Sequence, residues 1–171
     1  MSILNALLDR SIVLSFDRSG FERHARSFAP LPADLSSKHY VITGANSGLG
    51  LAAAVALAER GAAVHLLCRN EERGLAARDR LRRRTGNARV HLELVDVSSA
   101  DSIESCAARL GAVPDASIHG LVHNAGVLLH DAKRSVDGVE MTYATNILGS
   151  FRLTHLLRRK LTPQGLSLIH I

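Results

Sequence analysis

Beyond Pro32 the chain alternates short runs of apolar and β-branched residues with longer stretches in which apolar residues recur at helical spacing. The short runs predict strands near residues 39–43, 63–68, 90–95 and 118–123. Strands that alternate with helices pair in parallel, because each helix carries the chain back across one face of the sheet. The pattern therefore predicts an α/β fold, a doubly wound parallel sheet of which these are the first four strands.

The first two expected helices carry signals at their ends. Gly61 follows the first helix as a stop, and Asn70 is a good N-cap for the second helix, which should end before Gly86. The residues of the first helix that recur on one face are Leu49, Ala53, Ala56 and Leu57.

The starts of the third and last expected helices can also be read from the sequence. Ser98 and Asp101 form a capping box that starts the third helix, and the last helix should begin near Asp137-Gly138. The third helix turns Ile103, Ala107 and Leu110 toward the sheet. The stripe that we expect the last helix to bury consists of Val139, Tyr143, Ile147 and Phe151.

A glycine-rich turn, residues 43–50, joins the first strand to the first helix with the sequence Thr-Gly-Ala-Asn-Ser-Gly-Leu-Gly. Glycine permits a sharp turn at Gly44, leaves room for a pyrophosphate at Gly48, and lets the helix approach its strand at Gly50. The free N–H groups of the helix's first turn would face the anion. The alternative is a turn whose glycines serve the backbone alone. The residues expected to hold the diphosphate are Gly44, Asn46, Ser47, Gly48, Leu49 and Gly50.

Three further motifs follow in order. Asp96-Val97 comes after the third strand, Asn124-Ala125-Gly126 after the fourth, and Asn146 lies in the last helix. With the glycine turn, they resemble the short-chain dehydrogenase/reductase family over residues 38–161. Within it the chain looks most like the dehydrogenase/reductase family member 12 type, on Ser19-Gly20-Phe21-Glu22 and residues 65–69. The resemblance implies a Rossmann-type fold and an oxidoreductase that transfers hydride between a nicotinamide cofactor and a carbonyl or alcohol.

The resemblance also implies roles for these motifs. In a doubly wound sheet the topological switch lies between strands one and four, so the glycine turn and Asn124-Ala125-Gly126 should end at one crevice. Asp96 would accept a hydrogen bond from the adenine amino group, and the Val97 N–H would complete the pair. The alternatives are a plain turn at Asn124 and, at Asp96, a carboxylate that stabilises a helix N-terminus.

The end of the second strand bears on the choice between NAD and NADP. Enzymes that use NAD usually place Asp or Glu there, whereas this chain has Cys68 and then Arg69. A guanidinium pairs with a 2′-phosphate, which a carboxylate would repel. The sequence therefore favours NADP(H) over NAD(H), with a surface role for Arg69 as the alternative.

The catalytic set of the family is only partly present. Asn146 matches the family's Asn, which organises a proton relay. No Tyr-x-x-x-Lys occurs, because Tyr40 is followed four positions later by Gly44 and Tyr143 by Ile147. We expect the family's Ser, its Tyr and Lys, and its substrate-binding segment to belong to a longer protein, of which this chain is the cofactor-binding half. A short non-catalytic or regulatory protein that binds NADP(H) is the alternative.

Composition narrows the class of protein. A formal charge of +5 and a pI near 9.9 come largely from arginine, but the chain has no Trp and few other aromatics, which argues against a nucleic-acid partner. Cys68 and Cys106 are far apart and show no disulfide or metal spacing, so we expect an intracellular, cytoplasmic protein with no metal site. His119 and His123 are interpreted as strand side chains.

The two ends of the chain differ from its middle. Residues 1–36 form an N-terminal extension, expected to be helical, whose apolar clusters at Ile3-Leu4 and Ile12-Val13-Leu14 are too short for a membrane span. We expect it to pack on the domain, with a membrane surface as the alternative. Residues 37–165 form the cofactor-binding domain. Residues 166–171 match the translation of a transposon end used in sequencing-library adapters, so we expect a non-native tail. Because the chain then stops after the helix that follows the fourth strand, we expect residues 118–123 to form an exposed edge.

Overall fold

The computed structural model describes residues 18–28, 32–113 and 117–169, which fall into two compact units, Met1–Pro32 and Ala33–Ile171. In the first unit, helix α3 (Arg18–Ala25) is followed by a turn, and the rings of Phe21 and Phe28 meet edge to face at 6.4 Å. The apolar clusters at residues 3–4 and 12–14 lie outside the described residues.

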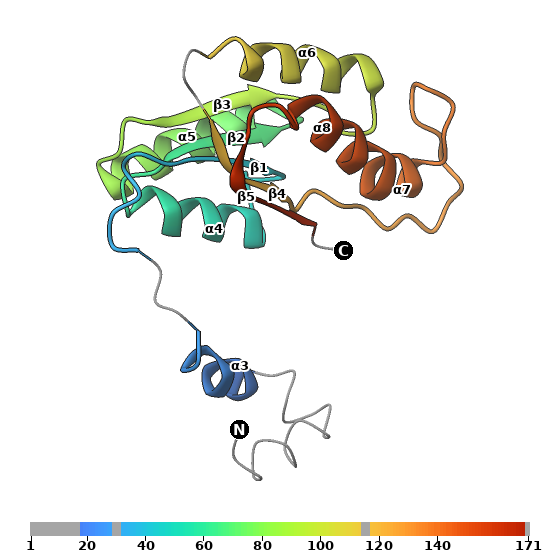
Figure 1. Ribbon diagram of the computed structural model, residues 1–171. Helices are drawn as coiled ribbons and strands as arrows, with labels where there is room; N and C mark the ends of the chain where they lie inside the picture. The colour runs from blue at the N-terminus through green and yellow to red at the C-terminus, as the bar shows by residue number, and fades with distance from the viewer. Residues whose placement is uncertain (1–17, 29–31, 114–116, 170–171) are drawn as a thin grey trace. The chain divides into compact units, whose positions relative to one another are not determined.

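The second unit is built on a five-stranded parallel sheet in the order β3-β2-β1-β4-β5 (Figure 1). The chain moves outward from β1 to β3 and then crosses to the other side of β1, which places the topological switch between β1 and β4. The predicted doubly wound fold is confirmed. The strands are β1 (His39–Thr43), β2 (Ala63–Cys68), β3 (Val90–Leu94), β4 (Ile118–His123) and β5 (Leu161–Ile169).

The expectation of an exposed edge at β4 is wrong, because β5 pairs with β4 in parallel, as at Gly120 opposite Leu166. The register shifts between Ile118 and Gly120, where β5 contains Pro163 and Gly165. Proline cannot donate to a ladder and is tolerated at such an irregularity. These two residues interrupt the β pattern in the sequence, which explains why the strand was missed.

Two helical layers cover the sheet. Helices α4 (Gly48–Ala58) and α5 (Glu71–Thr85) pack on the face that carries Ile42 and Leu66, and α6 (Ala100–Gly111) and α8 (Gly149–Leu157) pack on the face that carries Val41 and Leu67. In Figure 1, α6 and α8 lie above the sheet and α4 below it. Successive strand residues thus supply the two halves of the core, as the alternation of a pleated strand requires.

Helix α4 meets the sheet mainly through its smallest residues. Its buried residues are Gly50, Ala54 and Ala58, whereas Leu49 is 69% exposed. Small side chains let the helix axis approach the strands closely, so the larger residues are moved to the flanks of the contact. Of the residues expected on one face, Ala53 and Leu57 are partly buried against the core, whereas Leu49 is not. The predicted ends of α5 are confirmed, since Asn70 caps it and Gly86 ends it with a φ of 67°.

The expected capping box of α6 is displaced by one residue. Ser99 is the N-cap and accepts a hydrogen bond from the Ser102 N–H, while the Ser98 hydroxyl donates to Asp96 at 2.7 Å. Ser98 is thus engaged in the turn after β3 and is not free to cap. The predicted sheet-facing residues of the helix, Ile103, Ala107 and Leu110, are buried.

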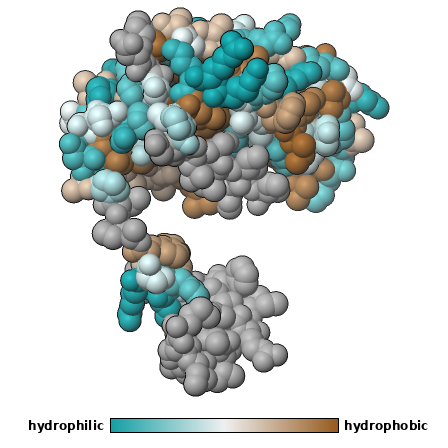
Figure 2. Space-filling view, viewed as in Figure 1, coloured by the Kyte–Doolittle hydropathy of each residue, from teal (hydrophilic) through white to brown (hydrophobic). Residues whose placement is uncertain are grey.

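The last helical segment starts later than expected. Helix α7 (Met141–Tyr143) is capped by Glu140 and runs through a π-helical turn, η1 (Ala144–Leu148), into α8. A π turn adds a residue, so side chains four apart no longer share one face. The predicted buried stripe is wrong: the exposed fractions are 53% for Tyr143, 45% for Ile147 and 65% for Phe151. Figure 2 shows hydrophobic surface over α7 and α8.

His123 lies buried between the sheet and α8, with Nε2 2.8 Å from Thr154 Oγ1. Burial lowers the pKa of His123 from 6.5 to about 4, and burial also lowers the pKa of His39 and His91. A neutral imidazole is therefore the folded form, whereas the unfolded chain takes up the proton below its higher pKa.

We expect the free energy of unfolding to fall by about 3 kcal/mol for His123 alone as the pH drops from about 6.5 to about 4. Below that range the loss levels off, because both states are then protonated. Urea unfolding of the chain and of His123→Asn across this window measures the effect. Asparagine keeps a hydrogen-bonding group near Thr154 but does not titrate, so an unchanged pH slope in the variant would contradict the assignment.

Candidate functional site

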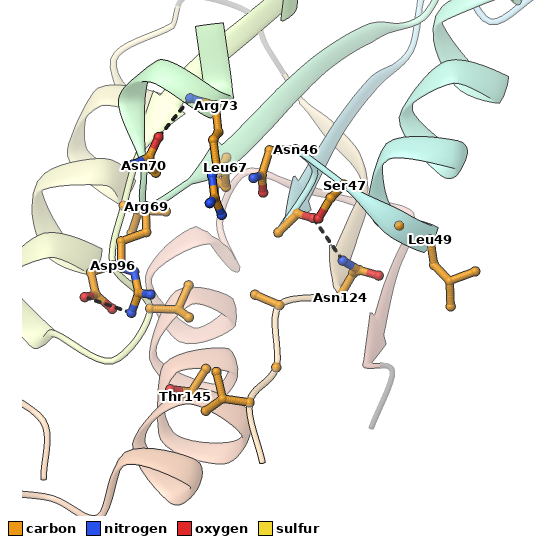
Figure 3. Close-up of a pocket in the computed structure, with 17 residues that line it drawn as sticks. Asn46, Ser47, Leu49, Leu67, Arg69, Asn70, Arg73, Asp96, Asn124 and Thr145 are labelled. Atoms are coloured by element: carbon orange, nitrogen blue, oxygen red, sulfur yellow. Dashed lines mark hydrogen bonds and ion pairs between the residues drawn. The ribbon is translucent and has the colours of Figure 1, made fainter. Parts of the chain in front are cut away.

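A cavity of about 600 Å³ opens at the carboxyl ends of β1, β2 and β4 (Figure 3). It lies at the topological switch of the sheet, where doubly wound folds bind their ligands. Four segments contribute to its walls: the turn after β1, the start of α5, the turn after β3 and the segment after β4. The predicted residues that line it are Gly44, Asn46, Ser47, Gly48, Leu49, Arg69, Asp96, Val97, Asn124, Ala125 and Gly126.

The glycines of the turn have different local roles. Gly44 and Gly48 have left-handed φ values of 65° and 56°. A Cβ on Gly44 would lie 3.0 Å from the Ala125 Cα, whereas a Cβ on Gly48 would meet no atom within 4 Å. Gly50 does not line the cavity, and a Cβ there would lie 2.5 Å from Asn124 Nδ2. Gly48 therefore borders open space, and Gly44 and Gly50 permit close packing behind it.

The N-terminus of α4 differs from those of α5 and α6. Asn70 and Ser99 cap the latter two with their side chains, while Ser47 makes no side-chain capping hydrogen bond. The first turn of α4, whose residues Gly48 and Leu49 line the cavity, therefore lacks that partner for its N–H groups. Such groups, with the positive end of the helix dipole, favour an anion at this point.

Thr43 and Asn124 join the two halves of the site. The N–H groups of Asn124 and Ala125 each donate to Thr43 Oγ1 at 3.0 Å. In return, Asn124 Nδ2 donates to the carbonyls of Thr43 at 3.1 Å and Gly44 at 3.2 Å. These bonds fix the turn after β1 against the segment after β4. Asn124 thus shapes the cavity by holding backbone as well as by lining it.

Asn146 lies outside the cavity lining, in η1. Its Oδ1 accepts from the Val127 N–H and its Nδ2 donates to the Val127 carbonyl, both at 2.9 Å. The side chain therefore anchors the segment after β4, of which Val127 itself lines the cavity. Its predicted place in a proton relay stays a prediction.

Asp96 and Arg69 face each other across one end of the cavity. Asp96 Oδ1 accepts from the Ser98 N–H at 2.9 Å and from the Ser98 hydroxyl, which holds the turn after β3. Its Oδ2 lies 4.0 Å from Arg69 Nη1, and the Arg69 side chain is 70% exposed. Part of the Arg69 charge is thus balanced by a carboxylate within the site.

Several lining residues were missed in the sequence. Leu67 and Val95 lie at the ends of β2 and β3, a position that the strand assignment alone could have flagged. Asn70 was recognised only as a helix cap, and Arg73, one turn after Arg69, was not singled out. Val127 and Thr145 carry no recognisable signal, because only the fold brings them to the cavity.

Other kinds of site find less support in the residues that the structure describes. Cys68 and Cys106 are free and buried, and burial raises the pKa of each thiol to about 11, so neither is a thiolate near neutral pH. Within the described ranges, His, Cys, Asp and Glu side chains form no group of three that could hold a metal ion. No helix among those same residues has the length and apolar character of a membrane span.

Comparison with known proteins adds to this geometry. The family model described as short chain dehydrogenase matches residues 38–169. Dehydrogenase/reductase SDR family member 12 from Bos taurus is 33% identical over 144 residues, 83% of this chain and 45% of that protein. Retinol dehydrogenase 11 from Homo sapiens is 40% identical over 135 residues, 79% of this chain and 42% of that protein. The chain spans less than half the length of these relatives.

Among solved structures, L-sorbose reductase from Gluconobacter frateurii, complexed with NADPH and L-sorbose, matches with a TM-score of 0.66 and 26% identity. The match covers 77% of this chain and 50% of that one. The similarity therefore extends from sequence to the arrangement of strands and helices.

Proposed function

The chain belongs to the short chain dehydrogenase family of oxidoreductases, and from this premise we propose that its cavity binds NADP(H). The observation that carries the proposal is the open space beside Gly48, next to the uncapped start of α4. A diphosphate fits this place because first-turn N–H groups would donate to it and no side chain intervenes. The turn residues from Gly44 to Leu49 would hold the diphosphate, and Gly50 would keep the helix close behind it.

The remaining lining residues suggest the orientation of the cofactor. Asp96 and Val97 would bind the adenine, and Asn124, Ala125 and Gly126 would follow the ribose toward the nicotinamide. Arg69 supports NADP(H) over NAD(H), since no carboxylate stands in its place at the end of β2. The NADPH held by the similar L-sorbose reductase is consistent with this choice.

The whole protein would use this site for carbonyl reduction or alcohol oxidation on a small molecule. The nicotinamide would supply or accept the hydride, and Asn146 would help to organise proton transfer from its place behind Val127. The name of the relative retinol dehydrogenase 11 makes retinol one candidate substrate. The alternative is a short protein that binds NADP(H) without turnover.

Replacing Arg69 by aspartate tests the cofactor choice. We expect Arg69→Asp to lower the ratio of NADPH to NADH affinity by about 10- to 100-fold, because the carboxylate repels the 2′-phosphate and accepts from the 2′-hydroxyl. Fluorescence titration with both cofactors gives the ratio, with Arg83→Asp on the exposed face of α5 as a control for net charge. An unchanged ratio in Arg69→Asp would make Arg69 a surface residue.

A further inference from the structure

Arg73 lines the same cavity as Arg69 but enters it from a different element. It is the third residue of α5, and its backbone N–H donates to Asn70 Oδ1 at 2.8 Å. Figure 3 shows the side chain extending from the start of α5 toward the space between Asn46 and Arg69. The cap therefore fixes the point from which the guanidinium reaches the cavity.

The charge of Arg73 has no partner within the part of the chain that the structure describes. Three other arginines of α5 have partners, Arg78 with Asp79, Arg82 with the Val90 carbonyl and Arg84 with Glu59. Arg80 and Arg83 have no such partner among the described residues, but neither lines this cavity. Arg69, in contrast to Arg73, lies 4.0 Å from the carboxylate of Asp96. Of the two cations in the cavity, Arg73 thus has the less compensated charge.

Arg73 is exposed, and its place in the first turn of α5 also bears on what it would bind. A cation in the first turn of a helix opposes the positive end of the dipole. Glu71 and Glu72 share that turn and moderate the effect, but both are exposed and neither lines the cavity. An anion beside the guanidinium would remove the conflict, and a guanidinium fork matches the geometry of a phosphate.

We propose that Arg73 is a further specificity-determining residue, whose guanidinium pairs with the 2′-phosphate of NADP(H) and contributes more to its selection than Arg69 does. The inference rests on the proposed function and deepens it. The phosphate would lie between the start of α5 and the turn after β1, because Arg73 also borders an adjoining cavity with Asn46 and Ser47. Arg69, whose charge is partly balanced by Asp96, would lie on the outer side of the phosphate.

The test compares four variants of the chain by calorimetric titration with NADPH and NADH. Arg73→Gln should weaken NADPH binding by about 10- to 100-fold and NADH binding by less than about 3-fold. Arg73→Lys should fall between Arg73→Gln and the unmodified chain, because the charge remains and the fork is lost. Arg69→Gln should have a smaller effect on the ratio than Arg73→Gln. Arg83→Gln, on the same helix but outside the cavity, should change neither affinity.

The outcomes separate this inference from the function on which it rests. If the chain binds both cofactors and Arg73→Gln leaves their ratio unchanged, or if Arg69→Gln changes it more, the inference is overturned and the proposed function stands. If the folded chain binds neither cofactor, both fail. Adenosine 2′,5′-bisphosphate against adenosine 5′-phosphate provides a second measure, and circular dichroism verifies that each variant is folded.

Discussion

Replacing Gly149 by alanine is expected to lower the free energy of unfolding by about 3 kcal/mol or more. Gly149 is the first residue of α8, and a Cβ there would overlap the carbonyl oxygen of Val97 and lie 3.1 Å from that of Ala144. Both obstacles are backbone atoms, so neither can turn aside as a flexible side chain would. Either α8 or the turn after β3 must move, and that turn carries Asp96 and Val97 of the candidate site.

Gly111, the last residue of α6, provides a matched control. A Cβ on Gly111 would meet no atom within 4 Å. Alanine should therefore be neutral or stabilise the helix by up to about 1 kcal/mol through its higher propensity. Urea unfolding of the two variants measures the difference, and equal midpoints would show that the contact between α8 and the turn after β3 is not tight.

The second large effect concerns the cofactor and not the fold. Gly48→Val is expected to weaken NADPH binding by at least about 100-fold, about 2.7 kcal/mol. The branched side chain would fill the open space beside the start of α4, where we place the diphosphate. The left-handed φ of 56° adds strain, which should cost about 1–2 kcal/mol of stability.

A second glycine separates strain from obstruction. Gly86 ends α5 with a φ of 67° and does not line the cavity. A Cβ added to it would meet no atom within 4 Å. Gly86→Val should lose similar stability and keep its affinity for NADPH. Fluorescence titration together with thermal unfolding of both variants distinguishes the two effects. Normal NADPH affinity in Gly48→Val would contradict the placement of the diphosphate.

The parts of the fold that local chemistry determines could be predicted from the sequence. Runs of apolar and β-branched residues predict four of the strands. The ends of α5 are predicted because the Asn70 side chain caps its first turn and Gly86 takes the left-handed φ that ends it. The predicted residues after β1, β3 and β4 gather at one cavity because the carboxyl ends of parallel strands meet at one edge of the sheet.

The incorrect predictions have physical causes that the spacing of apolar residues along the chain does not reveal. The π turn at Ala144–Leu148 changed which side chains of the last helix are buried. In α4 the contact with the sheet is made by Gly50, Ala54 and Ala58, which close packing favours over leucine. The fifth strand contains Pro163 and Gly165, which local propensity counts against a strand. Arg73 was missed because only the fold brings the start of α5 to the cavity.

Calorimetric titration of the folded chain with NADPH and NADH shows whether the cavity is an NADP(H) site. We predict saturable binding of NADPH at one site, about tenfold or more tighter than binding of NADH, since both Arg69 and Arg73 line the cavity. A chain that is folded by circular dichroism and binds neither cofactor, or that binds NADH as tightly as NADPH, would contradict it.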